Sequence, residues 1–127
     1  MQVFWHYRKL LIQIYSSARK SYISSILKKI DPKGKYINSI LSFDDCISYQ
    51  GIVLKPLQRV KGLVKGNYIL VDDNIANVLI NKGHSILISP YIGNSEDSEL
   101  LKLLNFLQEQ KESSDITKDI EQLYWTE

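Results

Sequence analysis

Cysteine is scarce in this 127-residue sequence, and its scarcity limits the chemistry available to the chain. Cys46, the single cysteine, can form no intrachain disulfide and cannot build a zinc site from several thiolates. Such cysteine usage is typical of an intracellular protein. No apolar run approaches the ~20 residues needed to cross a bilayer, and residues 1–11 lack the apolar core and cleavage signal of a secretory peptide. We therefore expect neither a transmembrane segment nor a secretory signal.

Familiar catalytic patterns are also missing. His6 and His84 have no acidic or serine pattern beside them, and neither Gly-x-Ser-x-Gly nor His-Glu-x-x-His occurs. The composition is that of a globular protein, 44% hydrophobic and 24% charged, at a length that suits one domain over residues 1–127. Residues 1–93 carry 13 basic against 5 acidic side chains, whereas residues 94–127 carry 3 against 9. The basic body favours anionic partners such as phosphopeptides or nucleic acid, although solvated lysines are the simpler interpretation.

Short apolar runs alternate with amphipathic stretches, which predicts an α/β fold with a mainly parallel sheet and flanking helices. Strands are expected over residues 10–15, 36–43, 68–71 and 85–89, with a hairpin over residues 48–54 that turns at Gly51. Helices are expected over residues 19–30, over a stretch bearing Leu100, Leu103, Leu104 and Leu107, and over residues 115–125. Asn94 or Ser95 is the expected cap of the second helix. Residues 57–64 are expected to form a helical turn, and residues 74–83 a short helix or a loop.

Polar side chains stand where several predicted strands end. Ser16 and Ser17 follow the first strand, Lys55 follows the hairpin, and Asp72 with Asp73 follow the strand at residues 68–71. In a parallel sheet the carboxyl ends of the strands share one edge, where ligands bind. Hydroxyl and ammonium groups suit phosphoryl oxygens, and paired carboxylates suit Mg²⁺. The alternative for the acidic stretch is a helix N-cap, since Asp and Asn side chains accept the first N–H groups of a helix.

The order of three stretches resembles a known family. The stretches are IYSSARKSYISSILKKIDPKGKY, DDCISYQGIVLKPL and YILVDDNIANVLINKGHSILISPYIGNSEDSELLKLLNFL. Together they resemble the catalytic domain of the Fcp/Scp-like phosphatases, also called the NLI-interacting-factor or CTD-phosphatase-like family, in the haloacid dehalogenase superfamily. The resemblance covers roughly residues 10–125. It implies a Rossmann-like haloacid dehalogenase fold and a Mg²⁺-dependent protein serine/threonine phosphatase acting through a phosphoaspartyl intermediate.

The resemblance also implies roles for particular residues. Ser16 stands where the family has the Thr or Ser that binds the phosphoryl group, and Lys55 stands in the place of the phosphate-binding lysine. Residues 71–74 resemble the motif that completes the metal site, which implies Asp73 as the direct Mg²⁺ ligand and Asp72 as its supporting partner. The implied partner is a phosphoserine or phosphothreonine protein or peptide, with no direct binding of nucleic acid.

One motif of the family does not occur in these 127 residues, which contain no Asp-x-Asp. In the family, the first Asp of Asp-x-Asp-x-Thr attacks phosphorus and the second acts as general acid/base. About nine residues precede LLIQIY, and we interpret them as too few for the strand that bears this motif. We therefore predict the C-terminal portion of such a domain, N-terminally incomplete, without a catalytic nucleophile and with Mg²⁺ bound only if upstream ligands are supplied.

A noncatalytic protein-binding module of the same fold is the alternative, for example a mitochondrial presequence-translocase receptor subunit. The pair Asp72-Asp73 favours the phosphatase branch, because the usual motif of that receptor is poorer in such a pair. The predicted location is intracellular, with the nucleus or cytoplasm ranked above the mitochondrion.

Overall fold

The computed structural model describes residues 2–6, 9–62, 68–109, 115 and 118 of the chain. Its strands are β1 (Gln2–His6), β2 (Lys9–Tyr15), β3 (Ile37–Leu41), β4 (Ile47–Tyr49), β5 (Ile52–Leu54), β6 (Tyr68–Asp72) and β7 (Ser85–Leu87). Its helices are α1 (Lys20–Ile30), α2 (Ile75–Ile80) and α3 (Glu99–Glu109), with 3₁₀ turns η1 (Phe43–Asp45) and η2 (Leu57–Arg59). Among the described residues, every helix is too short or too polar to traverse a bilayer.

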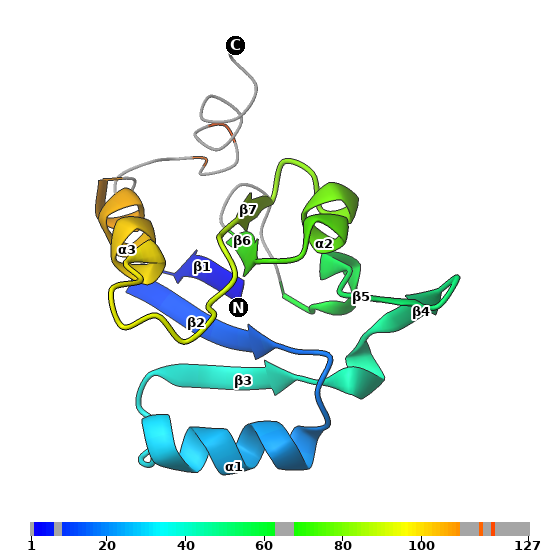
Figure 1. Ribbon diagram of the computed structural model, residues 1–127, viewed down its shortest axis with the longest axis horizontal. Coiled ribbons are helices and arrows are strands. Elements are labelled where there is room, and N and C mark those ends of the chain that lie inside the picture. Colours follow the sequence, from blue (N-terminus) through cyan, green and yellow to red (C-terminus); the bar gives the residue numbers. More distant parts are fainter. Residues whose placement is uncertain (1, 7–8, 63–67, 110–114, 116–117, 119–127) are drawn as a thin grey trace.

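Five strands form the main sheet in the order β3-β2-β1-β6-β7, and β4 pairs with β5 in a separate hairpin (Figure 1). The pairs β2 with β3 and β6 with β7 are parallel, whereas β1 runs antiparallel to both β2 and β6. The α/β class is thus confirmed, but the prediction of a mainly parallel sheet holds only for the outer strand pairs. Only two residues separate β1 from β2, and a connection this short permits an antiparallel hairpin but not a parallel crossover.

The strand β1 was not among the strands predicted from the sequence. It lies in the middle of the sheet, where Gln2 pairs with Gln13 of β2 on one side and with Leu70 of β6 on the other. Gln13 and Leu70 are therefore at the same level of the sheet. Because β2 and β6 both run antiparallel to β1, they run parallel to each other and end at the same edge, here called the upper rim.

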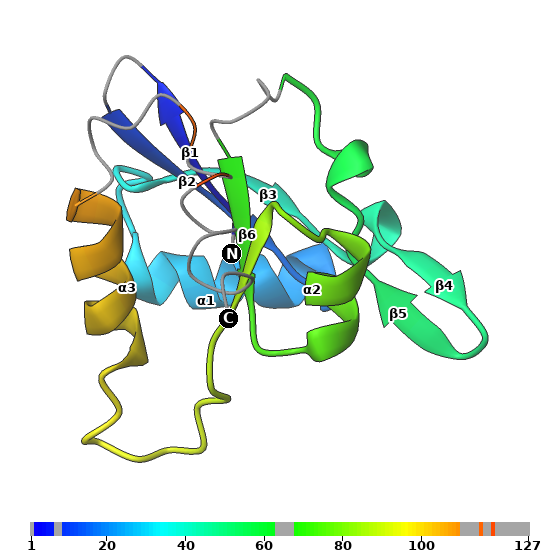
Figure 2. The same cartoon turned by 90° about the horizontal axis from the view of Figure 1, so that it is seen from above.

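Each face of the sheet carries its own part of the core. Alternate residues of β6 point to opposite faces, so that Ile69 and Val71 pack against Leu103 and Leu107 of α3. On the other face, Leu70 packs with Tyr15, Leu57 and Val60. Accordingly α3 and α2 lie on opposite sides of β6 in Figures 1 and 2. This arrangement leaves the segment before and around η2 on the same face as α2.

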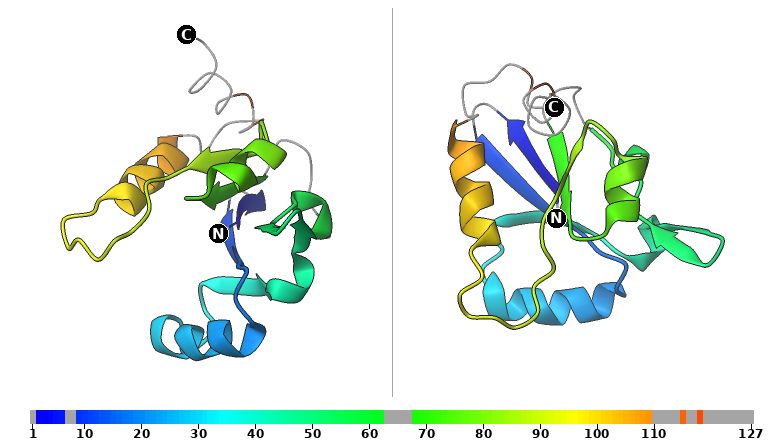
Figure 3. Two further views of the ribbon diagram at one scale, coloured as in Figure 1. Left: turned by 45° about the vertical axis from the view of Figure 1, so that its right-hand side comes forward. Right: turned by 45° about the horizontal axis from the view of Figure 1, so that its top comes forward.

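The other elements agree with the sequence patterns in most places. Helix α1 lies beside β3, and the β4–β5 hairpin turns through Gln50 (φ 50°) and Gly51 (φ 80°), as expected. Figure 3 shows that this hairpin projects from the side of the domain away from α3. The residues 74–83 contain a true helix, α2.

The start of α3 differs from the prediction. The helix begins at Glu99, because the side chains of Asn94 and Asp97 accept hydrogen bonds from the N–H groups of Glu96 and Glu99 in the preceding turns. Neither Asn94 nor Ser95 caps the helix. The helix expected over residues 115–125 lies outside the described residues, apart from 115 and 118.

Candidate functional site

A buried ion pair stands at the upper rim, where β6 ends. Lys55 Nζ lies 2.9 Å from Asp72 Oδ2, with the two side chains 16% and 3% exposed. Asp72 Oδ2 also accepts a hydrogen bond from Asn77 Nδ2 at 3.3 Å, and Oδ1 accepts one from the Asn74 N–H at 2.8 Å. Both carboxylate oxygens are therefore held in place by donors from the segment of Lys55 and from α2 with its N-cap.

The surroundings of Asp72 also fix its charge. Burial alone raises the pKa of this carboxyl, but the hydrogen bonds from Lys55 and from the Asn74 N–H outweigh burial and hold the pKa below its usual value. Asp72 is thus ionised at neutral pH and keeps the Lys55 ammonium at the rim.

Two asparagines of α2 and its C-cap position the backbone around Lys55. Asn77 Oδ1 accepts a hydrogen bond from the Lys55 N–H at 2.9 Å, and Asn81 Nδ2 donates to the Lys55 carbonyl at 2.9 Å. Asn81 Oδ1 also accepts from the Leu57 N–H at 3.0 Å. Both asparagines are buried, with exposures of 1% and 6%. Neither asparagine was predicted from the sequence, although two asparagines four residues apart within an apolar helical stretch are the signal that would have revealed them.

The two acids after β6 have different surroundings. Asp73 is exposed, whereas Asp72 is buried. The N-cap of α2 is Asn74, whose Oδ1 accepts from the Ala76 N–H at 2.9 Å. Of the two alternatives for this stretch, capping therefore falls to Asn74, and the metal-binding roles of Asp72 and Asp73 stay a prediction.

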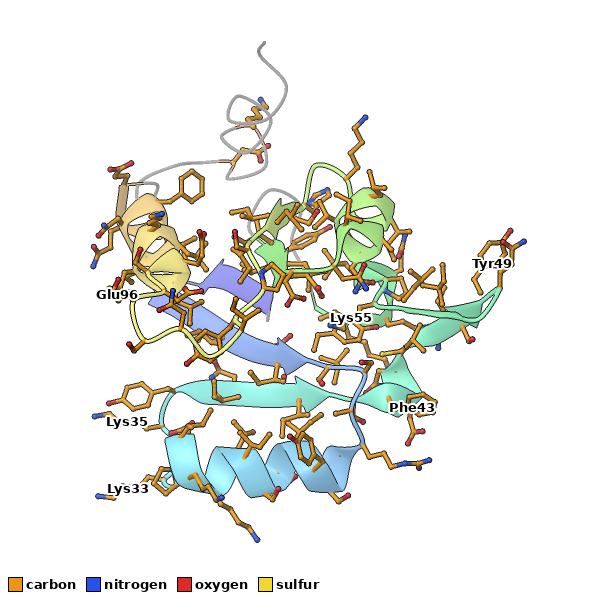
Figure 4. All side chains as sticks on the ribbon, viewed as in Figure 1. Lys33, Lys35, Phe43, Tyr49, Lys55 and Glu96 are labelled. Carbon is orange, nitrogen blue, oxygen red and sulfur yellow. The ribbon has the colours of Figure 1, made fainter. Side chains whose placement is uncertain are left out.

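Ser16 follows β2 at the same rim. Its N–H donates to the Leu41 carbonyl at 3.0 Å, and its Oγ accepts from the Ala18 N–H at 3.1 Å. Since Gln13 is level with Leu70, Ser16 comes level with Asp73, with the position of β1 between them. Ser16, Lys55, Asp72 and Asp73 thus belong to segments that end or pass at the upper rim, and Figure 4 shows Lys55 inward from the hairpin that carries Tyr49.

Tyr15 connects the strand before Ser16 to the segment that carries Lys55. Its hydroxyl lies 2.6 Å from the Asp45 carbonyl, to which it donates, and 3.3 Å from the Pro56 carbonyl. Burial, followed by the nearby Cys46 and Asp45, raises the pKa of Tyr15 to about 12. The phenol therefore stays protonated and donating at neutral pH. Sequence reasoning did not identify Tyr15, which reads only as the last aromatic of an apolar strand.

Cys46 lies close to the same group of residues without the features of a reactive thiol. Its Sγ is 3.5 Å from the Ser42 carbonyl and 3.7 Å from the Ser16 carbonyl. Burial is the largest effect on this thiol and raises its pKa. A thiol kept protonated is a poor nucleophile, so we assign Cys46 to packing at the rim.

The described carboxylates do not by themselves fit a Mg²⁺ site. No group of three or more His, Cys, Asp or Glu side chains within the described ranges is close enough together to hold a metal ion. Asp72 already receives an ammonium group and two further donors, which leaves Asp73 as the open carboxylate of the pair. Mg²⁺ gives up its water ligands reluctantly, so one exposed carboxylate is a poor site for it.

Comparison with known proteins places the chain in a family. The profile of the NLI interacting factor-like phosphatases matches residues 6–117, and the chain therefore belongs to this family. Two similar proteins are named mitochondrial import inner membrane translocase subunit TIM50, from Eremothecium gossypii (28% identity) and Kluyveromyces lactis (26%), each over 97 residues and 76% of this chain. A third is named phosphatase PSR1, from Saccharomyces cerevisiae, at 25% identity over 98 residues and 77% of this chain.

The matched region is a small part of each relative. It covers 20% of the two TIM50 proteins and 22% of PSR1, so the chain spans about a fifth of the length of the curated relatives it matches. The family expected from the sequence motifs is confirmed, and both branches that the sequence analysis weighed occur among the relatives.

The predicted location is wrong. From the sequence we predicted a nuclear or cytoplasmic location and ranked the mitochondrion below both. Two of the similar proteins are mitochondrial by name, which contradicts that ranking.

Proposed function

We propose that this domain recognises phosphoserine or phosphothreonine in proteins, and that the Ser16 hydroxyl and the Lys55 ammonium bind the phosphoryl oxygens. The observation that carries the proposal is the Lys55–Asp72 ion pair at the same rim as Ser16, which directly follows β2. A lysine ammonium has three N–H donors, and Asp72 engages one of them. The remaining donors are available for a phosphoryl group, while Asp72 keeps the ammonium oriented.

The finer assignment of the fold is part of the same proposal. The described sheet would be part of a Rossmann-like haloacid dehalogenase fold, with β1 in the position of the central strand. The resemblance places the aspartyl nucleophile near the carboxyl end of that strand, but β1 ends with His6 at the edge opposite Asp72. We therefore propose that the 127-residue chain binds phosphopeptides with negligible turnover.

Mg²⁺ enters this proposal only with additional ligands. Asp73 would contribute a carboxylate, supported by Asp72, and the cation would offset the charge of the phosphoryl group. Since these two residues alone do not fit the ion, phosphate binding through Ser16 and Lys55 is proposed to be independent of metal in this chain.

The test compares a fluorescein-labelled phosphoserine peptide with the same peptide carrying serine, using fluorescence anisotropy and a chelator. The chain is expected to bind the phosphopeptide at least about tenfold more tightly, as one charge-assisted hydrogen bond provides about 1.5–3 kcal/mol. Lys55→Met should remove the preference for the phosphopeptide. Ser16→Ala should weaken this preference and should disturb the fold less than Lys55→Met does. Lys61→Met, at an exposed lysine on the turn after η2, is the matched control and should keep the preference.

Equal affinity for the two peptides would refute phosphate recognition. Turnover of an aryl phosphate by the purified chain, lost in Lys55→Met and kept in Lys61→Met, would refute the proposal that the chain has no usable nucleophile.

Binding of unphosphorylated protein segments is a second candidate, favoured by the reversed central strand and by the two relatives named as translocase subunits. If this second function is correct, the chain binds a basic amphipathic presequence peptide, and the protein to which the chain belongs is mitochondrial. Lys55→Met should then leave binding unchanged, which distinguishes this candidate from phosphate recognition in the same anisotropy assay.

A further inference from the structure

An apolar groove runs from the upper rim along α1. A cavity of about 140 Å³ lies between α1 and β2, with Ser16 at one end, Ile14 in its wall, and Ile23, Ile26 and Ile30 along the helix. A water molecule takes up about 30 Å³ of the liquid, so the cavity offers the room of four or five waters, suited to one aliphatic side chain. The groove therefore connects the proposed phosphate-binding hydroxyl to an apolar surface.

The apolar side of α1 is only partly covered. Ile23 is 5% exposed, whereas Ile26 is 39% and Ile30 64% exposed. Tyr22, which also lines the groove, is 62% exposed. Hydrophobic side chains at helical spacing that stay this exposed are typical of a surface that receives a partner.

The surroundings of the groove are basic. Residues 19–35 contain six exposed basic side chains, namely Arg19, Lys20, Lys28, Lys29, Lys33 and Lys35. None of these six forms a salt bridge within the described part of the chain. The one acid of the segment, Asp31, is buried, and its carboxylate accepts the N–H groups of residues 35–37. Figure 4 shows Lys33 and Lys35 near the carboxyl end of α1. Ser16 precedes the first residue of this helix, Lys20, so the two lysines belong to the opposite end of α1.

We propose that this groove selects among phosphopeptides, taking an aliphatic residue close to the phosphoserine and acidic residues about five positions away. The inference rests on the proposed function, because Ser16 is what joins the groove to the phosphate. Helix α1 has 11 residues and is thus about 16 Å long, and an extended peptide covers that length in about five residues. A phosphoryl group at Ser16 then places the fifth residue beside Lys29 and Lys33.

The charge of residues 19–35 favours an acidic peptide as the occupant of the groove. A basic amphipathic segment would bring its lysines toward residues 19–35, whose exposed charged side chains are all basic, whereas an acidic segment would meet opposite charge near both ends of α1. Aliphatic contact in the cavity and acidic contact at its far end are independent features of the peptide, so they can be removed one at a time.

The experiment uses three phosphoserine peptides of equal length in the anisotropy assay. The first peptide has leucine next to the phosphoserine and two glutamates about five residues further on. In the second peptide serine replaces the leucine, and in the third lysine replaces both glutamates. The first is expected to bind about tenfold more tightly than either of the others. Ile26→Gln should abolish the preference for leucine, and the double variant Lys29→Glu, Lys33→Glu should reverse the preference for glutamate. Leu101→Gln, at a 65% exposed residue of α3, is the matched control and should preserve both preferences.

The possible failures are distinguishable. If no peptide binds better than its unphosphorylated form, the proposed function itself is refuted. If the phosphate preference persists but the three phosphopeptides bind equally, the groove is refuted while the function stands. Sedimentation equilibrium tests whether a second copy of the chain fills the groove instead of a phosphopeptide. A dimer that Ile26→Gln dissociates would show this and would overturn the proposal.

Discussion

Replacing Lys55 by methionine is expected to destabilise the domain by about 2 kcal/mol. Removing one partner of a buried ion pair costs about 3–5 kcal/mol when the other charge is left without compensation. Two features lower that cost here. Asp72 keeps the hydrogen bonds from Asn74 and Asn77, and Lys55 is 16% exposed, so that water can reach the site. Methionine has a similar length and keeps the packing of the lysine stem.

The double variant Lys55→Met, Asp72→Asn isolates the interaction between the charges. With the carboxylate neutralised, the methionine no longer leaves a buried charge unpaired, so the double variant should be more stable than the sum of the single costs predicts. We expect a coupling free energy of about 1–2 kcal/mol between the two positions. Urea titration of the four proteins, followed by circular dichroism, measures it.

The pH dependence gives an independent check. Because the pKa of Asp72 is lower in the folded state than in the unfolded state, its contribution to stability is complete above the unfolded-state pKa of about 4 and is lost as the pH falls through the folded-state pKa. The difference in unfolding free energy between wild type and Lys55→Met should therefore be constant from pH 7 to about pH 5 and should shrink below about pH 4. Additive costs in the double variant, together with a difference that does not change with pH, would refute a stabilising ion pair.

Three further outcomes are expected. Tyr15→Phe removes the donor to the Asp45 and Pro56 carbonyls and should lower the unfolding free energy by about 1–2 kcal/mol in urea titration. Because the folded-state pKa of Tyr15 is raised to about 12, the stability from this phenol should be complete below about pH 10 and lost as the pH rises toward 12, which phenolate absorbance can follow. Asn81→Ala should lower the unfolding free energy by about 2–3 kcal/mol, since it leaves buried backbone groups of Lys55 and Leu57 unpaired. The control Asn94→Ser, in an exposed turn, should change the unfolding free energy by less than about 0.5 kcal/mol. Millimolar Mg²⁺ should leave the thermal unfolding temperature of the chain within about 1 °C, and a rise of several degrees would show that the described carboxylates do form a metal site.

Local sequence patterns predicted β2, α1 and the separate β4–β5 hairpin well. The strand at residues 10–15, the helix at 19–30 and the hairpin around Gly51 follow from apolar runs and turn residues that are read within a few positions. The start of α3 was misplaced because Asn94 accepts a hydrogen bond within its own turn instead of capping a helix. Asn and Asp have this alternative wherever a turn precedes a helix, so composition alone does not locate the cap.

The site was less predictable than the fold. The side chains that hold Lys55 in place come from Asp72, Asn77 and Asn81, which are 17 to 26 residues away in sequence and meet only because α2 packs beside the loop before η2. A polar side chain inside an apolar helix signals a buried hydrogen bond but not its partner. Similarly, the last residue of β2 gives no indication in the sequence that its hydroxyl reaches the Pro56 carbonyl.

The direction of β1 determines what the upper rim can do. A parallel strand in the same position would need a crossover of a dozen or more residues before β2, whereas the two residues between β1 and β2 allow only the reversed strand. Gln2, the first residue of β1, is level with Gln13 and Leu70, which lie two residues, or about 7 Å, before the level of Tyr15 and Asp72. The other residues of β1 lie progressively farther from that rim. A single substitution within residues 2–6 therefore places a carboxylate no nearer to the level of Ser16 and Asp73 than Gln2 is, which is the geometric reason for expecting little turnover from the phosphate-binding rim proposed here.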